Sequence, residues 1–157
     1  MNTSNRLTPI LETTISLNTI HKLTENNFKF IAESLEKEAG DPVWRQRSRK
    51  LLQVAYDMVL YVQASQNTPC ITIKDFVTFL ELHHLQTAMI TNGGMGENPV
   101  KAVADLKNYL ITLPGFDCGC SCLNLGKPKE LYKQHGFVVM QIISLINAIN
   151  HKSLWID

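Results

Sequence analysis

The sequence predicts an all-α fold, a compact bundle of about five helices in a single domain. Apolar residues recur at alternating spacings of three and four through most of the chain, which is the pattern of helices with one buried face. Capping residues, glycines and prolines separate these stretches, and no stretch alternates strongly enough to indicate a strand. At 157 residues the chain can bury a sizeable core.

The stretch 42–65 is expected to be the central helix. Asp41 supplies the side-chain acceptor of an N-cap, and Pro42 occupies the first helical position, where its missing N–H costs nothing. Gly40 just before them can end the preceding helix. The residues expected on the buried face of the central helix are Trp44, Ser48, Leu51, Ala55, Met58 and Val62.

Four further helices complete the predicted bundle. All five core helices are expected at about 24–39, 42–65, 73–91, 99–113 and 128–150. Thr24 and Thr72 are the predicted N-caps of two of them, and Asp75 stands where it can complete a capping box. Gly136 inside the last helix costs about 1 kcal/mol relative to Ala, so we expect it to permit close packing or a bend. Residues 1–22 are expected to form an irregular or extended lead-in.

Composition narrows the classes of function. The formal net charge of +1 gives no support to nucleic-acid binding through bulk charge, although a local basic patch remains open. No apolar run reaches the roughly 20 residues that span a bilayer, and the N-terminus lacks a signal-peptide pattern. A soluble chain in the cytoplasm is therefore expected. We interpret the four cysteines as free thiols without a metal, because the C-x-C-x-C spacing differs from that of structural zinc sites; they are Cys70, Cys118, Cys120 and Cys122.

No catalytic or cofactor motif occurs in the sequence, so the chain by itself is expected to be neither an enzyme nor a cofactor-binding or metal-binding protein. The glycines of 92–97 lack the Lys and the hydroxyl of a P-loop and are interpreted as a loop. The adjacent His83 and His84 point about 100° apart on a helix and cannot chelate one metal. A thiol- or metal-dependent enzyme that pairs His135 with the 118–122 cysteines is kept as a third hypothesis.

Four basic side chains fall within six residues near the start of the central helix: Arg45, Arg47, Arg49 and Lys50. In one interpretation they form a solvated face whose stems cover apolar surface. In the other, Arg45 and Arg49 lie one turn apart and present a cationic strip to DNA phosphates or to an acidic partner segment. The residues leave both interpretations open.

Three blocks of sequence resemble, in this order, the all-α domain of type IV secretion and conjugation coupling ATPases, particularly the DotL-like branch. The first is Asp-Pro-Val-Trp at 41–44 with the Arg-rich helix that follows. The second is L-K-N-Y-L-I-T-L-P-G-F at 106–116, and the third is Gln-His-Gly-Phe at 134–137 followed by Met-Gln. The residues of these blocks to which we assign structural roles are Trp44, Tyr109, Pro114, Gly115 and Gly136.

The resemblance implies that this chain is a domain inserted in a RecA-like motor, part of a hexameric ATPase anchored in the bacterial inner membrane and facing the cytoplasm. ATP and Mg would belong to that parent protein, because the chain lacks Walker motifs. The family implies a domain that recognises secreted effector proteins or relaxase–DNA, together with adaptor or chaperone proteins. The alternative is a stand-alone helical DNA-binding or adaptor protein that uses Arg45 and Arg49. The loops at 92–97 and 118–122 depart from the family pattern, which leaves the partner open.

Overall fold

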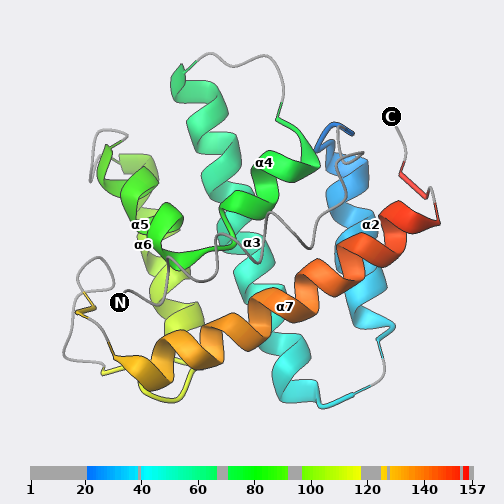
Figure 1. Cartoon of the computed structure of the whole chain (residues 1–157). Coiled ribbons are helices and arrows are strands. Elements are labelled where there is room, and N and C mark those ends of the chain that lie inside the picture. Colours follow the sequence, from blue (N-terminus) through cyan, green and yellow to red (C-terminus); the bar gives the residue numbers. More distant parts are fainter. Residues whose placement is uncertain are drawn as a thin grey trace.

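A computed structural model describes residues 21–38, 40–66, 71–91, 97–117, 125–126, 128–152 and 154–155. These residues form six α-helices: α2 (Glu25–Glu36), α3 (Pro42–Gln66), α4 (Ile73–Thr78), α5 (Leu82–Thr91), α6 (Glu97–Leu110) and α7 (Lys129–His151). The described part of the chain contains no β-strand, and its only extended pairing is an isolated bridge between Lys22 and Thr72. The predicted all-α class is confirmed (Figure 1).

Helix α3 is the centre of the bundle, as expected, because it contacts each of the other five helices. Its predicted face is largely correct. Ser48, Leu51, Ala55 and Met58 are buried, while Trp44 and Val62 at the two ends of the face are half-buried. The buried surface is wider than predicted, since helices pack on α3 from several sides; its further buried residues are Leu52, Val54 and Val59.

The N-caps predicted at Thr24, Asp41 and Thr72 are present. The Thr24 hydroxyl accepts a hydrogen bond from the Asn27 N–H at 3.0 Å. Thr72 and Asp75 form a reciprocal capping box at the start of α4, with both hydrogen bonds at 3.1 Å. Asp41 Oδ1 accepts from the Val43 N–H at 2.9 Å, which satisfies one of the free donors at the N-terminus of α3.

The single helix predicted at 73–91 is wrong, because two helices, α4 and α5, occupy that stretch. Leu80 and Leu82 are both fully buried. Residues two apart point about 200° apart on one helix, so an unbroken helix would need neighbours on two opposite sides to bury both. Glu81 Oε2 accepts a hydrogen bond from the His84 N–H at 3.3 Å and thereby caps the new helix.

Two helix boundaries also differ from the prediction. Helix α6 begins at Glu97 rather than 99 and ends at Leu110 rather than 113. Pro99 falls within its first turn, where a backbone N–H has no partner inside the helix. Helix α7 begins at Lys129, with Pro128 as its N-cap, and ends at His151. The predicted lead-in up to residue 20, the loop glycines and all four cysteines lie outside the described residues.

The core runs between α3 and the other helices and is mainly aliphatic. Aromatic residues strengthen one end of it: Phe28 stacks on Tyr56 with ring centroids 3.9 Å apart and meets Phe76 edge-on at 6.4 Å. Its largest fully buried residues are Ile31, Leu35, Leu51, Leu52, Met58, Ile73, Phe76, Leu80, Leu82, Leu85 and Tyr109. Among the described helices, none combines the length and apolar character needed to cross a membrane.

Candidate functional site

The three blocks of sequence that carry the family resemblance meet in space. The first turns of α3, the last turn of α6 with the turn that follows it, and the N-terminal half of α7 come together, and side chains from each contact the next. We call this meeting point the three-block junction and define it by Trp44, Arg47, Ser48, Tyr109, Thr112, His135, Phe137 and Gln141. Its inner side is buried, and its outer side faces solvent.

Trp44 and Arg47 hold the outer side of the junction together. The Trp44 ring meets Phe137 of α7 edge-on, with centroids 6.2 Å apart and planes at 82°. The Arg47 guanidinium carbon lies 4.7 Å from the Trp44 ring centroid, within the range of a cation–π contact. Arg47 Nε also donates to the Thr112 carbonyl at 3.0 Å. One arginine therefore links the start of α3 to the turn after α6.

Two polar pairs hold the inner side. The Tyr109 hydroxyl lies 2.7 Å from Nδ1 of His135, and both side chains are fully buried. Ser48 donates from its hydroxyl to Gln141 Oε1 at 3.1 Å, which ties α3 to α7. Burial lowers the pKa of His135 to about 4, so this imidazole is neutral at physiological pH. The Leu80 backbone raises the pKa of His135 by a smaller amount. No described residue forms a hydrogen bond of ordinary geometry with His135 Nε2.

The Pro114–Gly115 turn packs against the first turn of α7, next to the junction. Gly115 has φ of +89°, and a Cβ placed there would lie 2.7 Å from the backbone nitrogen of Leu131. Glycine is therefore required for two independent reasons, backbone conformation and close approach to α7. Pro114 is exposed in the same turn. Gly136 lies half-buried within α7, next to the junction.

The outer side of the junction leaves large apolar side chains in contact with solvent. Val43 is 48% exposed, Phe137 50% and Met140 37%, and half-buried Trp44 lies beside Phe137. Single exposed apolar residues are ordinary, but a group of them next to an arginine and a tryptophan has the composition of a protein-binding hot spot. This group was not predicted from sequence, because helical spacing alone assigns Trp44 to the buried face.

The structure separates the four predicted basic residues. Arg45 Nη1 donates to the Glu36 carbonyl at 3.3 Å, and Arg49 Nη1 forms an ion pair with Glu36 Oε1 at 3.0 Å. Both therefore point toward the end of α2, whereas Arg47 points toward the turn after α6. Lys50 is half-buried. The four charges therefore do not form one strip, and of the three guanidinium groups only that of Arg49 pairs with a described carboxylate.

A second buried polar group, not predicted from sequence, lies at the break between α4 and α5. Glu81 is fully buried, and its Oε2 lies 3.1 Å from His84 Nδ1, without the geometry of a hydrogen bond. Its Oε1 has no hydrogen-bond partner among the residues that the structure describes. Burial raises the pKa of Glu81, while the neighbouring histidines partly oppose the shift. The sequence signal was a glutamate between Leu80 and Leu82, inside a stretch expected to be one continuous helix.

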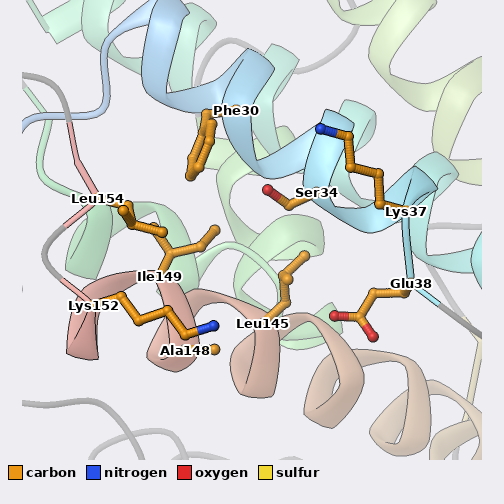
Figure 2. A pocket seen from close by; sticks show the side chains of 9 residues that line it. All are labelled: Phe30, Ser34, Lys37, Glu38, Leu145, Ala148, Ile149, Lys152 and Leu154. Atoms are coloured by element: carbon orange, nitrogen blue, oxygen red, sulfur yellow. The ribbon is translucent and has the colours of Figure 1, made fainter.

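A hollow of about 280 Å³ opens between α2 and the C-terminal half of α7 (Figure 2). Apolar side chains from both helices line it, together with Lys37 and Glu38 at the end of α2 and Lys152 at the end of α7. Its volume is near the lower limit for a ligand pocket, so it suits a single side chain better than a cofactor. The residues that line it are Phe30, Ser34, Lys37, Glu38, Leu145, Ala148, Ile149, Lys152 and Leu154.

The described residues contain no group of three or more His, Cys, Asp or Glu side chains placed to hold a metal ion. His83 and His84 have ring centroids 5.8 Å apart, and His84 faces Glu81 rather than a shared ligand position. The proposed pairing of His135 with the 118–122 cysteines falls partly outside the described residues; within them, His135 faces Tyr109.

Comparisons of the chain with protein-family models, with curated proteins and with solved structures give no match.

Proposed function

We propose that this chain is the substrate- or adaptor-recognition domain of a type IV secretion or conjugation coupling ATPase. Its partners would be secreted effector proteins or a relaxase, with adaptor or chaperone proteins, at the cytoplasmic face of the inner membrane. The parent protein would bind ATP and Mg and would assemble as a hexamer. The chain itself would supply recognition and no catalysis.

One observation carries the proposal: the three blocks that resemble the family are the ones that contact each other. Arg47 reaches the second block at Thr112, Trp44 reaches the third at Phe137, and Tyr109 of the second reaches His135 of the third. Blocks whose side chains contact one another each need particular residues at particular positions, because a change in one block removes a contact of another. The spacing that suggested the family therefore has a physical reason within this chain.

The exposed side of the same junction supports recognition as its role. Val43, Phe137 and Met140 leave apolar surface uncovered beside Trp44 and Arg47. Tryptophan, arginine, phenylalanine and methionine are enriched at protein–protein interfaces. A surface of this kind suits a protein partner better than a small polar substrate.

The alternative, a stand-alone DNA-binding or adaptor protein, depends on Arg45 and Arg49. Arg45 keeps its charge, because it donates to the neutral backbone carbonyl of Glu36. Arg49 forms an ion pair with the Glu36 carboxylate, which reduces the positive charge that the pair of arginines offers to phosphates. For this reason we place protein recognition ahead of DNA binding. Sequence on either side of the gene segment separates the two proposals: Walker A and B motifs flank it in the first and are missing in the second.

Binding measurements test the proposal directly. The purified chain is titrated with segments of candidate relaxases and effectors, and with single- and double-stranded DNA, from low to physiological salt. We expect at least one protein segment to bind, with a weaker salt dependence than DNA would show. An absence of every protein partner at low salt would contradict the proposal.

A further inference from the structure

Helix α7 presents one continuous exposed face. Figure 1 shows this helix lying across the front of the bundle, with no other described helix over it. At 100° per residue its exposed positions from Lys133 to His151 fall within about 80° of the helix circumference. We call this surface the α7 face and define it by Lys133, Phe137, Met140, Ser144, Ala148 and His151, all of which are exposed.

The centre of the α7 face is apolar and uncharged. Residues 134–150 contain no Asp, Glu, Lys or Arg. Phe137 and Met140 project from the surface, and the edge-on contact with Trp44 widens the apolar area toward α3. Ser144 and Ala148 are small, so another helix could approach the α7 backbone closely there.

Both ends of the face are basic. Lys129 and Lys133 lie at its N-terminal end. Lys152 lies at its C-terminal end, with Lys37 across the hollow. None of these four lysines takes part in an ion pair with another described residue. The acidic residues adjacent to them in sequence are Glu130, which accepts from Gln134 at 2.8 Å, Glu36, which forms an ion pair with Arg49, and Glu38. Each end therefore keeps an excess of positive charge.

We infer that the α7 face docks an amphipathic helix of a protein partner, with an apolar stripe at its centre and Asp or Glu residues at both ends. The inference rests on the proposed function and specifies the chemistry of the partner. Phe137 and Ala148 are 11 residues apart, about 16 Å along the helix, so the partner needs apolar residues at i, i+4, i+7 and i+11. The last of these would lie at Ala148, where the hollow can accept its side chain.

Charge selects this partner over a second copy of the chain. A two-fold dimer through the α7 face would place the Lys133 end of one copy over the Lys152 end of the other. Basic groups would then face basic groups at both ends of the interface. An acid-flanked helix instead meets opposite charge at both ends.

Three synthetic helical peptides serve as probes of the full 157-residue chain. The first carries leucines at i, i+4, i+7 and i+11 with two glutamates at each end. The second has the same leucines but lysines at the ends, and the third keeps the glutamates but replaces the leucines with serine. Fluorescence anisotropy at low salt measures their affinities. We expect the first peptide to bind about tenfold more tightly than either control.

Paired variants locate the binding. Phe137→Ala is expected to weaken binding of the first peptide about fivefold or more, whereas Leu60→Ala, which removes another apolar residue, 45% exposed on α3, leaves it unchanged. Lys133→Glu should weaken the acid-flanked peptide and strengthen the lysine-flanked one. Lys74→Glu, at an exposed lysine on α4, should do neither. Circular dichroism of each variant confirms that the fold is retained.

Equal binding of the acid-flanked and lysine-flanked peptides would overturn the inference, as would equal effects of Phe137→Ala and Leu60→Ala. Dimerisation of the chain through Phe137, detected by light scattering, would also overturn it. If a relaxase or effector segment binds the chain and neither Lys133→Glu nor Phe137→Ala changes its affinity, the α7 face is not the binding site. That result would overturn the inference while leaving the proposed function in place. Binding confined to the acid-flanked peptide, without any secretion substrate, would support the face and count against the proposed function.

Discussion

The hydroxyl of Tyr109 and Nδ1 of His135 lie 2.7 Å apart inside the protein, with neither side chain in contact with solvent. They join α6 to α7 at a point where no backbone hydrogen bond links the two helices. Because the pKa of His135 is lowered to about 4, the imidazole is neutral and Nδ1 can accept a hydrogen bond from the phenol O–H. This buried pair links the second block to the third on the inner side of the junction, and the Trp44–Phe137 contact links the first block to the third on its outer side.

Removing the Tyr109 hydroxyl should therefore destabilise the fold. Tyr109→Phe leaves a buried ring nitrogen of His135 without its partner, and we expect a loss of about 1–3 kcal/mol in the free energy of unfolding. Tyr56→Phe is the matched control, because its ring stacks on Phe28 and no described residue hydrogen-bonds to its hydroxyl. Urea denaturation of the two variants and the parent chain measures the difference. Equal losses would show that the Tyr109–His135 bond contributes no specific stability.

Stability should also fall with acid because of His135. Burial lowers its folded pKa to about 4, whereas the unfolded value is about 6.5, so between these two values the unfolded chain binds more protons. The contribution is fully present above pH 6.5 and is lost as the pH falls toward 4, by about 3 kcal/mol in total. His135→Gln, which keeps an acceptor for Tyr109, should remove this slope.

The comparison of the parent chain with His135→Gln isolates that effect from Glu81. Burial raises the pKa of Glu81, so its contribution has the opposite sign: it is present below the unfolded pKa and lost as the pH rises through the folded one. Because both chains retain Glu81, its effect cancels in their difference. Unfolding curves at several pH values between 4 and 7 supply the measurement, and parallel slopes would contradict the assignment to His135.

Gly115 should tolerate no side chain. Gly115→Ala combines a positive φ with a Cβ that would approach the Leu131 nitrogen to 2.7 Å, and we expect a loss above about 2 kcal/mol. Gly126→Ala is the control, because Gly126 also has a positive φ, +66°, but nothing lies within 4 Å of its added Cβ. That variant should lose only about 1 kcal/mol. Thermal and urea unfolding compare the two, and similar losses would mean that the turn can move away from α7.

Arg47 should matter more than its neighbour Arg49. Arg47→Lys loses the hydrogen bond to the Thr112 carbonyl and the planar contact with Trp44, at an expected cost of about 1–2 kcal/mol. Arg49→Lys changes only an exposed ion pair with Glu36, which contributes at most about 0.5 kcal/mol. Unfolding of both variants at low and high salt provides the test. A larger effect at Arg49 would indicate that the basic residues act as surface charges rather than as links between helices.

Local signals in the sequence were sufficient to predict the helices and most of their starting points. Thr24, Asp41 and Thr72 cap the helices that they were expected to cap, because an N-cap depends on atoms within three residues of it. The periodic apolar residues of α3 likewise identified the central helix. The break at Glu81 was missed because its cause is the burial of Leu80 and Leu82 against other helices.

The sequence by itself determined the fold class and the caps at Thr24, Asp41 and Thr72, since each depends on neighbours along the chain. Only the tertiary structure decided which side chains of the three sequence blocks, at 41–44 with the helix that follows, 106–116 and 134–137, contact one another. Arg47 could not be distinguished from Arg45 and Arg49 until the turn carrying Thr112 lay beside it, 65 residues further along the chain. Trp44 and Phe137 left part of their surface exposed for the same reason, because burial is set by which helices cover a side chain and not by its spacing.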